Sequence, residues 1–286
     1  MQARIASFLL SFVLCLNSAL ATPLDDAIAL YKEKKFTEAR AELEKITTAE
    51  PQNAEACHYL GLALRRSRDP ALLESSVDWL KKAVDLKPDN TTYLVEYGST
   101  SLLLADKKFS LSAANHGRAA LEKAVELDPA NLDAREGLFL FHEQAPWPIG
   151  DSAKAAAQLE AIRERDPALA ITLDISCKIK AKDYDDAFRL CDEALVQNPE
   201  NYIVLLQYSR IALSSGQHLD QALTGLRKGL NLTPPPKAPG PAFVHCRIGN
   251  LLEKQGDPAA ARAAYEAALQ ADPHFAKARE ALENLK

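Results

Sequence analysis

Histidines and cysteines are the side chains of this chain that would most readily support catalysis or metal binding. The sequence contains no HExxH, GxSxG, GxxxxGK(S/T) or CxxC pattern. His142 and Glu143 are adjacent, but neighbouring helical residues point in different directions and cannot ligate one ion. His245 lies on an apolar stripe, which favours a packed core residue. All six histidines are scattered: His58, His116, His142, His218, His245 and His274. The sequence therefore predicts no catalytic residue, no metal site and no cofactor.

Four cysteines follow the N-terminal segment, namely Cys57, Cys177, Cys191 and Cys246, and they have two interpretations. Cys177 and Cys191 would fall on the two helices of one hairpin, about a helical turn out of register. A disulfide needs Cα atoms within about 7 Å, so the register argues against this pair. The alternative, which we favour, is four buried thiols acting as small apolar side chains.

Seven regularly spaced prolines, which we call the proline ladder, mark the ends of the helical segments that position all these residues. The prolines follow one another at spacings of 37, 41, 38, 32, 35 and 39 residues, and each closes an amphipathic helical stretch. Proline cannot continue a helix, because it lacks an N–H and its φ is fixed. A near-constant period in this range indicates stacked supersecondary units, none of which buries its apolar face alone. The ladder consists of Pro51, Pro88, Pro129, Pro167, Pro199, Pro234 and Pro273.

The last unit, Ala242 to Phe275, shows the pattern most cleanly. Two apolar stripes with helical spacing are separated by Gly256 and Asp257, which break the helix. Small residues stand where the two helices must cross closely, and the unit ends at a proline. These residues, Gly249, Ala261, Tyr265, Ala268 and Pro273, resemble the tetratricopeptide repeat, a 34-residue helix-turn-helix unit.

The resemblance implies an all-α fold, a right-handed α-solenoid of about seven helical hairpins with a C-terminal capping helix. We divide the chain into a signal peptide (1–21), repeats 1 to 6 (22–232), a proline-rich connector (233–241), and the last repeat with the capping helix (242–286). Extra residues around 105–112 and a loop at 146–151 interrupt the repeat; that loop resembles one in a group of exported bacterial tetratricopeptide proteins. Residues 171–180 alternate like a strand, but without any partner strand they are expected to be helical.

The N-terminal segment has the layout of a secretory signal peptide. Arg4 precedes a 12-residue apolar run, and Ala19 and Ala21 occupy the positions that a signal peptidase reads. We expect cleavage after Ala21 and an exported, periplasmic or secreted chain; an uncleaved anchor is the alternative. Leu14 before Cys15 argues against a lipoprotein. No later stretch predicts a membrane span in the mature chain.

The charge balance excludes one class of partner. The net charge is −5, or −6 without Arg4, and basic residues are interspersed with acidic ones along every predicted helix. Nucleic-acid binding normally requires a basic patch or stripe. We therefore expect no nucleic-acid partner.

The resemblance also implies that the first helix of each hairpin lines a concave groove that grips a peptide or a partner's helix. The predicted groove mixes apolar side chains with both signs of charge, and each leucine in it could instead pack only against neighbouring helices. Some cytosolic tetratricopeptide cochaperones hold a C-terminal carboxylate with Lys, Asn and Arg spread over three consecutive repeats. Here Arg247 and Asn250 share one repeat and the preceding repeats lack the companion lysines, which argues against that clamp. The groove candidates are Arg65, Arg66, Leu102, Leu103, Leu140, Glu143, Leu206, Arg210, Leu213, Asn250, Glu253 and Lys254.

Trp147, between two prolines of the inserted loop, is either a plug over its own hairpin, which we favour, or a contact for a partner. Together these features predict a non-enzymatic scaffold or adaptor of the cell envelope that binds a protein or peptide partner. The alternative is a periplasmic receptor for a small ligand or glycan. An enzyme would need a site assembled across repeats. The sequence leaves the partner's identity and the oligomeric state open.

Overall fold

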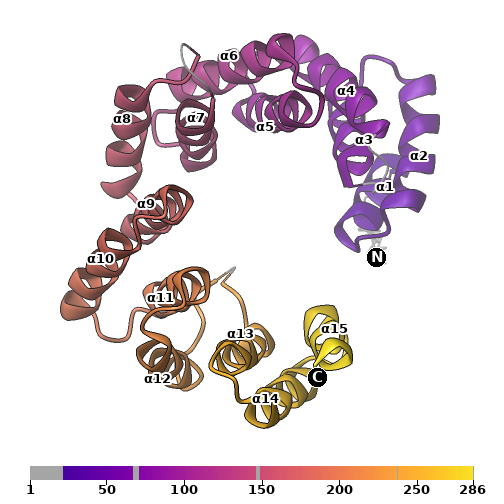
Figure 1. Ribbon diagram of the computed structural model, residues 1–286. Coiled ribbons are helices and arrows are strands. Elements are labelled where there is room, and N and C mark those ends of the chain that lie inside the picture. The colour runs from indigo at the N-terminus through magenta and orange to yellow at the C-terminus, as the bar shows by residue number, and fades with distance from the viewer. Residues whose placement is uncertain (1–21, 67–70, 146–148, 237, 286) are drawn as a thin grey trace, which may run out of the picture. The chain divides into compact units, whose positions relative to one another are not determined.

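The computed structural model describes residues 22–66, 71–145, 149–236 and 238–285, and these residues form fifteen α-helices and no strand (Figure 1). The expected all-α solenoid of seven hairpins with a C-terminal capping helix is confirmed. The predicted signal peptide and Trp147 lie outside the described residues.

The helices pair in chain order, and each pair forms one hairpin. The bounds are α1 (Pro23–Lys32) with α2 (Phe36–Ala49), α3 (Ala54–Arg66) with α4 (Leu72–Leu86), α5 (Thr91–Lys108) with α6 (Leu111–Leu127), α7 (Leu132–Gln144) with α8 (Ser152–Arg163), α9 (Pro167–Ala181) with α10 (Tyr184–Gln197), α11 (Tyr202–Ser215) with α12 (Leu219–Gly229), and α13 (Pro241–Lys254) with α14 (Pro258–Ala271), followed by α15 (Ala276–Asn284).

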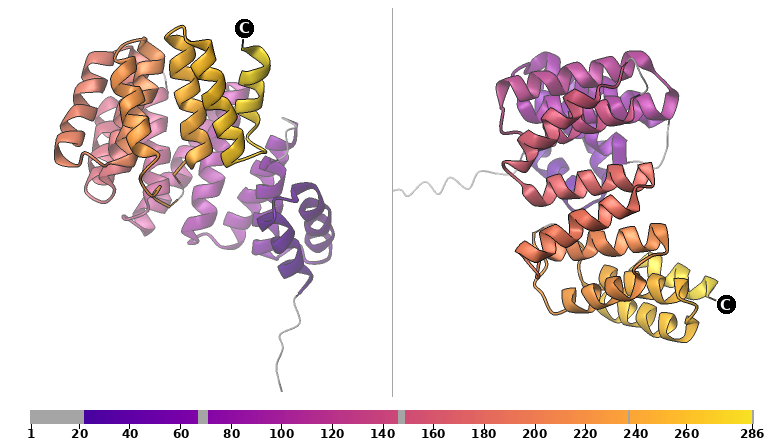
Figure 2. Two further views of the ribbon diagram at one scale, coloured as in Figure 1. Left: turned by 90° about the horizontal axis from the view of Figure 1, so that it is seen from below. Right: turned by 60° about the vertical axis from the view of Figure 1, so that its left-hand side comes forward.

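The chain divides into two compact units, Met1–Leu127 and Asp128–Lys286. In the first unit α2 packs on α3 and α4 on α5, so that successive hairpins are joined. In the second unit the hairpins from α9 to α14 stack side by side, and α15 packs on α14 (Figure 2). The second unit has a core that continues through several hairpins, from Ile175 in α9 to Ala278 in α15.

An asparagine two residues after a proline starts four of the first helices. The side chains of Asn53, Asn90, Asn131 and Asn201 each accept a hydrogen bond from the backbone N–H three residues later, at 2.9–3.2 Å. Such a cap satisfies an N–H group that the helix itself leaves without a partner. The Pro-x-Asn sequence therefore ends one hairpin and starts the next.

Two other helices also begin at a side-chain cap. Asp151 caps the helix after the inserted loop, because its side chain accepts from the backbone N–H groups of Ala153 and Lys154. Thr22 caps α1 reciprocally: its hydroxyl accepts from the Asp25 N–H at 3.1 Å, and its backbone nitrogen donates to Asp25 Oδ2 at 2.9 Å. This capping box holds the first described residue against α1.

Glycines allow the two helices of a hairpin to approach closely. A Cβ atom added to Gly249 would lie 2.4 Å from Tyr265 Cε1, and one added to Gly117 would lie 2.8 Å from the backbone oxygen of Gly98. Both distances are far shorter than van der Waals contact. Tyr265 and Ala268 are fully buried, as expected for residues at a helix crossing.

The irregular segments resolve as follows. Residues 171–180 lie within α9, so the helical expectation is confirmed, and α9 contacts α8, α10 and α11. The extra residues near 105–112 lengthen α5 and begin α6. The turn between the two helices places Phe109 at φ 52°, and this residue is 96% exposed. Cys57, Cys177, Cys191 and Cys246 are free thiols. The prediction that His245 is a packed core residue is wrong: His245 is half-buried, while its neighbours Val244 and Cys246 are in the core.

Candidate functional site

The first helices of successive hairpins contact one another within each unit. In the first unit α3 contacts both α1 and α5, and in the second unit α11 contacts both α9 and α13. We use the name first-helix face for the side of each unit on which the first helices of successive hairpins lie next to one another. It is described separately for each unit.

Hydrogen bonds cross the first-helix face of the second unit between equivalent places in consecutive repeats. Arg210 Nη1 donates to Ser176 Oγ at 2.8 Å, and Gln207 Nε2 lies 3.4 Å from Thr172 Oγ1. Arg247 Nη1 lies 3.5 Å from the hydroxyl of Ser209. The partners are 34 to 38 residues apart, which is one repeat. The face is therefore a polar seam between hairpins.

The first unit has a matching arginine with a different environment. Arg65 Nη1 of α3 forms an ion pair with Glu96 Oε2 of α5 at 2.7 Å and donates to Thr100 Oγ1 at 3.0 Å. Both partners are about one repeat away. The positive charge of Arg65 is thus neutralised within the chain.

Tyr265 connects the second helix of the last hairpin to the first-helix face. Its ring lies against α13 at Gly249, and its hydroxyl is 2.9 Å from Asn250 Oδ1 and 2.8 Å from Glu253 Oε2. Burial and the nearby Glu253 carboxylate raise the pKa of Tyr265, so the phenol stays protonated. A fully buried tyrosine therefore orients two of the predicted groove residues.

The predicted leucines lie mostly inside the structure. Leu206 is only 8% exposed and belongs to the core, and Leu213 packs against the same core. Leu140 packs on the apolar cluster of α7 to α9, and Leu102 lies against Gly117 of α6. For these four, the alternative of packing against neighbouring helices fits the structure. Leu103, which is 39% exposed, is the predicted leucine that remains accessible.

The charged candidates are more accessible. Arg66, Glu143, Glu253 and Lys254 are exposed, and Arg210 is half-buried. The carboxylate of Glu143 acts across to α9, where it joins burial in raising the pKa of the Cys177 thiol to about 11. That thiol is therefore protonated and weakly nucleophilic at neutral pH. Nothing in its surroundings supports cysteine catalysis.

Sequence reasoning missed the role of Arg247, Gln207 and Ser176 on this face. The signal was available: a serine or threonine stands 34 to 38 residues before each of Gln207, Arg210 and Arg247. It was missed because apolar periodicity, which the repeat comparison follows, ignores polar positions between the stripes.

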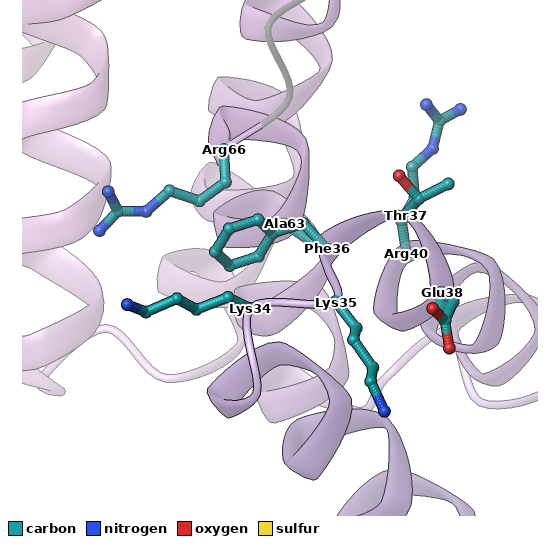
Figure 3. Close-up of a pocket in the computed structure, with 8 residues that line it drawn as sticks. All are labelled: Lys34, Lys35, Phe36, Thr37, Glu38, Arg40, Ala63 and Arg66. Atoms are coloured by element: carbon teal, nitrogen blue, oxygen red, sulfur yellow. The ribbon is translucent and has the colours of Figure 1, made fainter. Parts of the chain in front are cut away.

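A second feature is a hollow of about 350 Å³ at the turn between α1 and α2, beside the end of α3. Figure 3 shows Lys34 and Arg66 extending on the same side of the Phe36 ring, while Lys35 and Glu38 point elsewhere. Four of its lining residues are basic and one is acidic, and Arg66 among them was predicted. The full lining is Lys34, Lys35, Phe36, Thr37, Glu38, Arg40, Ala63 and Arg66.

The described residues contain no group of histidine, cysteine or carboxylate side chains arranged to hold a metal ion. Among the described helices, none combines the length and apolar character needed to cross a membrane.

The paired helices, their close glycine crossings and their stacking define a helical-hairpin repeat protein. Models of the tetratricopeptide repeat match residues 24–91, 178–238 and 242–275, the last with the bounds expected from the sequence. Together they cover more than half of the chain, which belongs to the tetratricopeptide-repeat family.

Solved structures agree on the fold. A tetratricopeptide repeat protein from Parabacteroides merdae is 15% identical, with 91% of this chain and 96% of that chain aligned and a TM-score of 0.57. Yeast Tom70 is 19% identical with a TM-score of 0.63; the alignment covers 92% of this chain but only 56% of Tom70. No curated protein matches the chain.

Proposed function

We propose that this protein is an exported, non-enzymatic adaptor that binds a peptide or helix of a partner protein on its first-helix faces. Tetratricopeptide repeats act in general as scaffolds for protein interaction, and the fold shows this much. The observation that supports a site on the second unit is its seam of polar side chains, whose partners are one repeat apart. Ser209 is fully buried, while the other members of the seam are half-buried. Spaced polar groups of this kind suit an extended ligand that contacts several repeats at once.

Site-resolved crosslinking tests the binding surface. A photoreactive residue replaces Arg210 or Lys254 on first helices, or Arg262 or Glu266 on the exposed side of α14 as matched controls. We expect one partner to be captured from envelope extracts by the first-helix positions and not by the controls. Equal capture at all four positions would contradict the proposal.

Export is part of the proposal and has its own measurement. The sequence of the N-terminal segment supports cleavage after Ala21. Mass spectrometry of the protein from its native cells should find a chain that starts at Thr22, in the periplasm or the medium. A chain that retains residues 1–21 would contradict export by a cleaved leader.

A further inference from the structure

Phe109 and Leu111, at the turn between α5 and α6, form an exposed apolar tip on the first unit. Phe109 is 96% exposed and Leu111 is 54% exposed. Single exposed apolar residues are common on protein surfaces, but Phe109 also has a left-handed φ of 52°, which is costly for a residue with a Cβ. The tip belongs to the extra residues near 105–112 that interrupt the repeat pattern. The tip therefore needs an explanation beyond the stacking of hairpins.

The turn of the last hairpin shows that glycine fits the place that Phe109 occupies. The Ser110 N–H donates to Ala105 O at 3.1 Å and closes α5 around Phe109. The equivalent bond between α13 and α14 is 3.0 Å long, and the left-handed residue there is Gly256. Lys34 has this place in the α1–α2 turn, with φ 63°. Both turns keep a long side chain where glycine is less strained, which points to a role for the side chain itself.

The hairpin turns of the first unit lie along one edge. Arg66, at the end of α3, lines the same hollow as Lys34 of the α1–α2 turn. Lys108, at the end of α5, forms an ion pair with Glu74 near the start of α4, with 2.6 Å between Nζ and Oε1. Because α3 and α4 form one hairpin, these two contacts join the hollow to the apolar tip. We call this edge the turn edge; its described residues are 33–38, 66, 74 and 106–111.

Two basic side chains of the turn edge have no counter-charge. Lys34 and Arg66 extend on the same side of the Phe36 ring, while Glu38 points elsewhere (Figure 3). In the part of the chain that the structure describes, neither Lys34 nor Arg66 forms an ion pair with a carboxylate. Exposed ion pairs are weak, so the other lysines of the edge also remain available to an anionic surface. These pairs are Lys35 with Glu33, Lys107 with Asp106, and Lys108 with Glu74.

We propose that the turn edge docks the first unit on the surface of a membrane that contains anionic phospholipids. Phe109 and Leu111 enter the boundary between headgroups and acyl chains, and Lys34 and Arg66 contact lipid phosphates. Apolar insertion and the attraction of basic side chains to anionic headgroups together hold a peripheral protein on a bilayer. A protein partner would need a pocket shaped for the protruding tip, whereas a fluid bilayer accepts it without one. This docking needs no membrane-spanning helix and is independent of the proposed peptide binding.

Co-sedimentation with vesicles tests the proposal on the purified chain that starts at Thr22, because an attached leader would itself bind lipid. We expect binding to vesicles made of equal amounts of phosphatidylcholine and phosphatidylglycerol. Affinity should be at least about tenfold lower for phosphatidylcholine alone, and it should fall as salt is added. Binding that is equal on both kinds of vesicle, or absent from both, would overturn the proposal.

Variants of the turn edge locate the contact. Phe109→Asn should lower the affinity for the mixed vesicles at least about tenfold, and so should Lys34→Gln combined with Arg66→Gln. Asparagine tolerates the left-handed conformation, so the loss in Phe109→Asn does not arise from unfolding, and thermal unfolding checks this. The matched controls should bind normally: Leu127→Asn, 43% exposed at the opposite end of α6, and Lys45→Gln, exposed and farther along α2. Equal losses in edge and control variants would contradict docking by this edge.

A fluorescent probe measures insertion of the tip directly. Tryptophan at position 109, in Phe109→Trp, should shift its emission to shorter wavelength on mixed vesicles and be quenched by brominated acyl chains. Leu127→Trp should show neither change beyond the signal of the unsubstituted protein. Absence of quenching at position 109 would overturn the proposal. The tip would be a protein contact instead if Phe109→Asn abolished capture of a partner protein while vesicles were not bound.

Discussion

At the scale of single residues, a buried uncharged histidine and glycines in crowded positions each lead to a prediction about stability. His58 is buried between repeats and stacks on Tyr93 with ring centroids 4.5 Å apart, and among the described residues its Nε2 has no hydrogen-bond partner. Burial, together with the Arg65 charge, lowers its pKa from 6.5 to about 4. Such a group couples folding to proton concentration.

The sign of the pH effect follows from that shift. Because the unfolded chain protonates His58 near pH 6.5 and the folded chain only near 4, its neutral form stabilises the fold fully above pH 6.5. About 3 kcal/mol should be lost as the pH falls from 6.5 to 4. His58→Phe, which keeps a ring on Tyr93, should remove this part of the dependence. Denaturant unfolding of both proteins at several pH values measures it, and parallel pH profiles would contradict it.

Gly117 tests the close approach of α5 and α6. Gly117→Ala should lower the free energy of unfolding by about 1–3 kcal/mol, because the new Cβ meets the backbone of Gly98, which cannot rotate away. Gly229→Ala in α12 is the matched control, since its Cβ would meet only Tyr202 ring atoms at 3.9 Å. Alanine there should stabilise by about 0.5–1 kcal/mol through helix propensity. Urea unfolding compares the two; a loss in both variants would refute the argument from crowding.

At the scale of elements, the end of α5 is one of four places in the described residues where a non-glycine residue has a positive φ. Phe109 adopts the left-handed conformation although it is not glycine, and its side chain is almost fully exposed. Its backbone N–H still closes the helix on Ala105 O. The conformation costs a residue with a Cβ roughly 1–2 kcal/mol, and asparagine tolerates it better.

Phe109→Asn should therefore raise the free energy of unfolding by about 0.5–1 kcal/mol. Leu111→Asn, an exposed apolar residue in ordinary helical conformation, is the control and should gain nothing. Chemical denaturation of the three proteins gives the comparison. If Phe109→Asn were less stable than the original protein, the aromatic side chain would have a packing role in solution.

The elements were predictable because apolar period and proline position decide them. The hairpin of 242–275 and the helical state of 171–180 followed from stripes, breakers and the absence of partner strands. The face itself was only partly predictable. Leu206 and Leu140 could not be assigned to core or groove, since both are apolar residues of first helices, and which neighbour covers them depends on the packing angle. Arg247 was missed because its significance lies in a partner one repeat away.

At the scale of the whole molecule, stability should be local. In a stacked repeat protein each hairpin contacts only its neighbours, so a defect in one hairpin weakens those beside it most. In Gly117→Ala, native-state hydrogen exchange should speed up in α3 to α6 and stay at wild-type rates in α13 and α14. Mass spectrometry of peptide fragments resolves these helices. A uniform loss of protection over all fifteen described helices would show that the chain unfolds as one cooperative unit.

The capping box at Thr22 has a consequence for maturation. If the leader is removed after Ala21, as proposed, the nitrogen that donates to Asp25 Oδ2 at 2.9 Å changes from an amide to an α-ammonium group. The cap would then become an ion pair at the start of α1, formed by the proteolytic step itself. Processing would alter the charge of the first hairpin. Asp25→Asn would remove the ion pair with the new α-ammonium group and would leave the cleavage site unchanged.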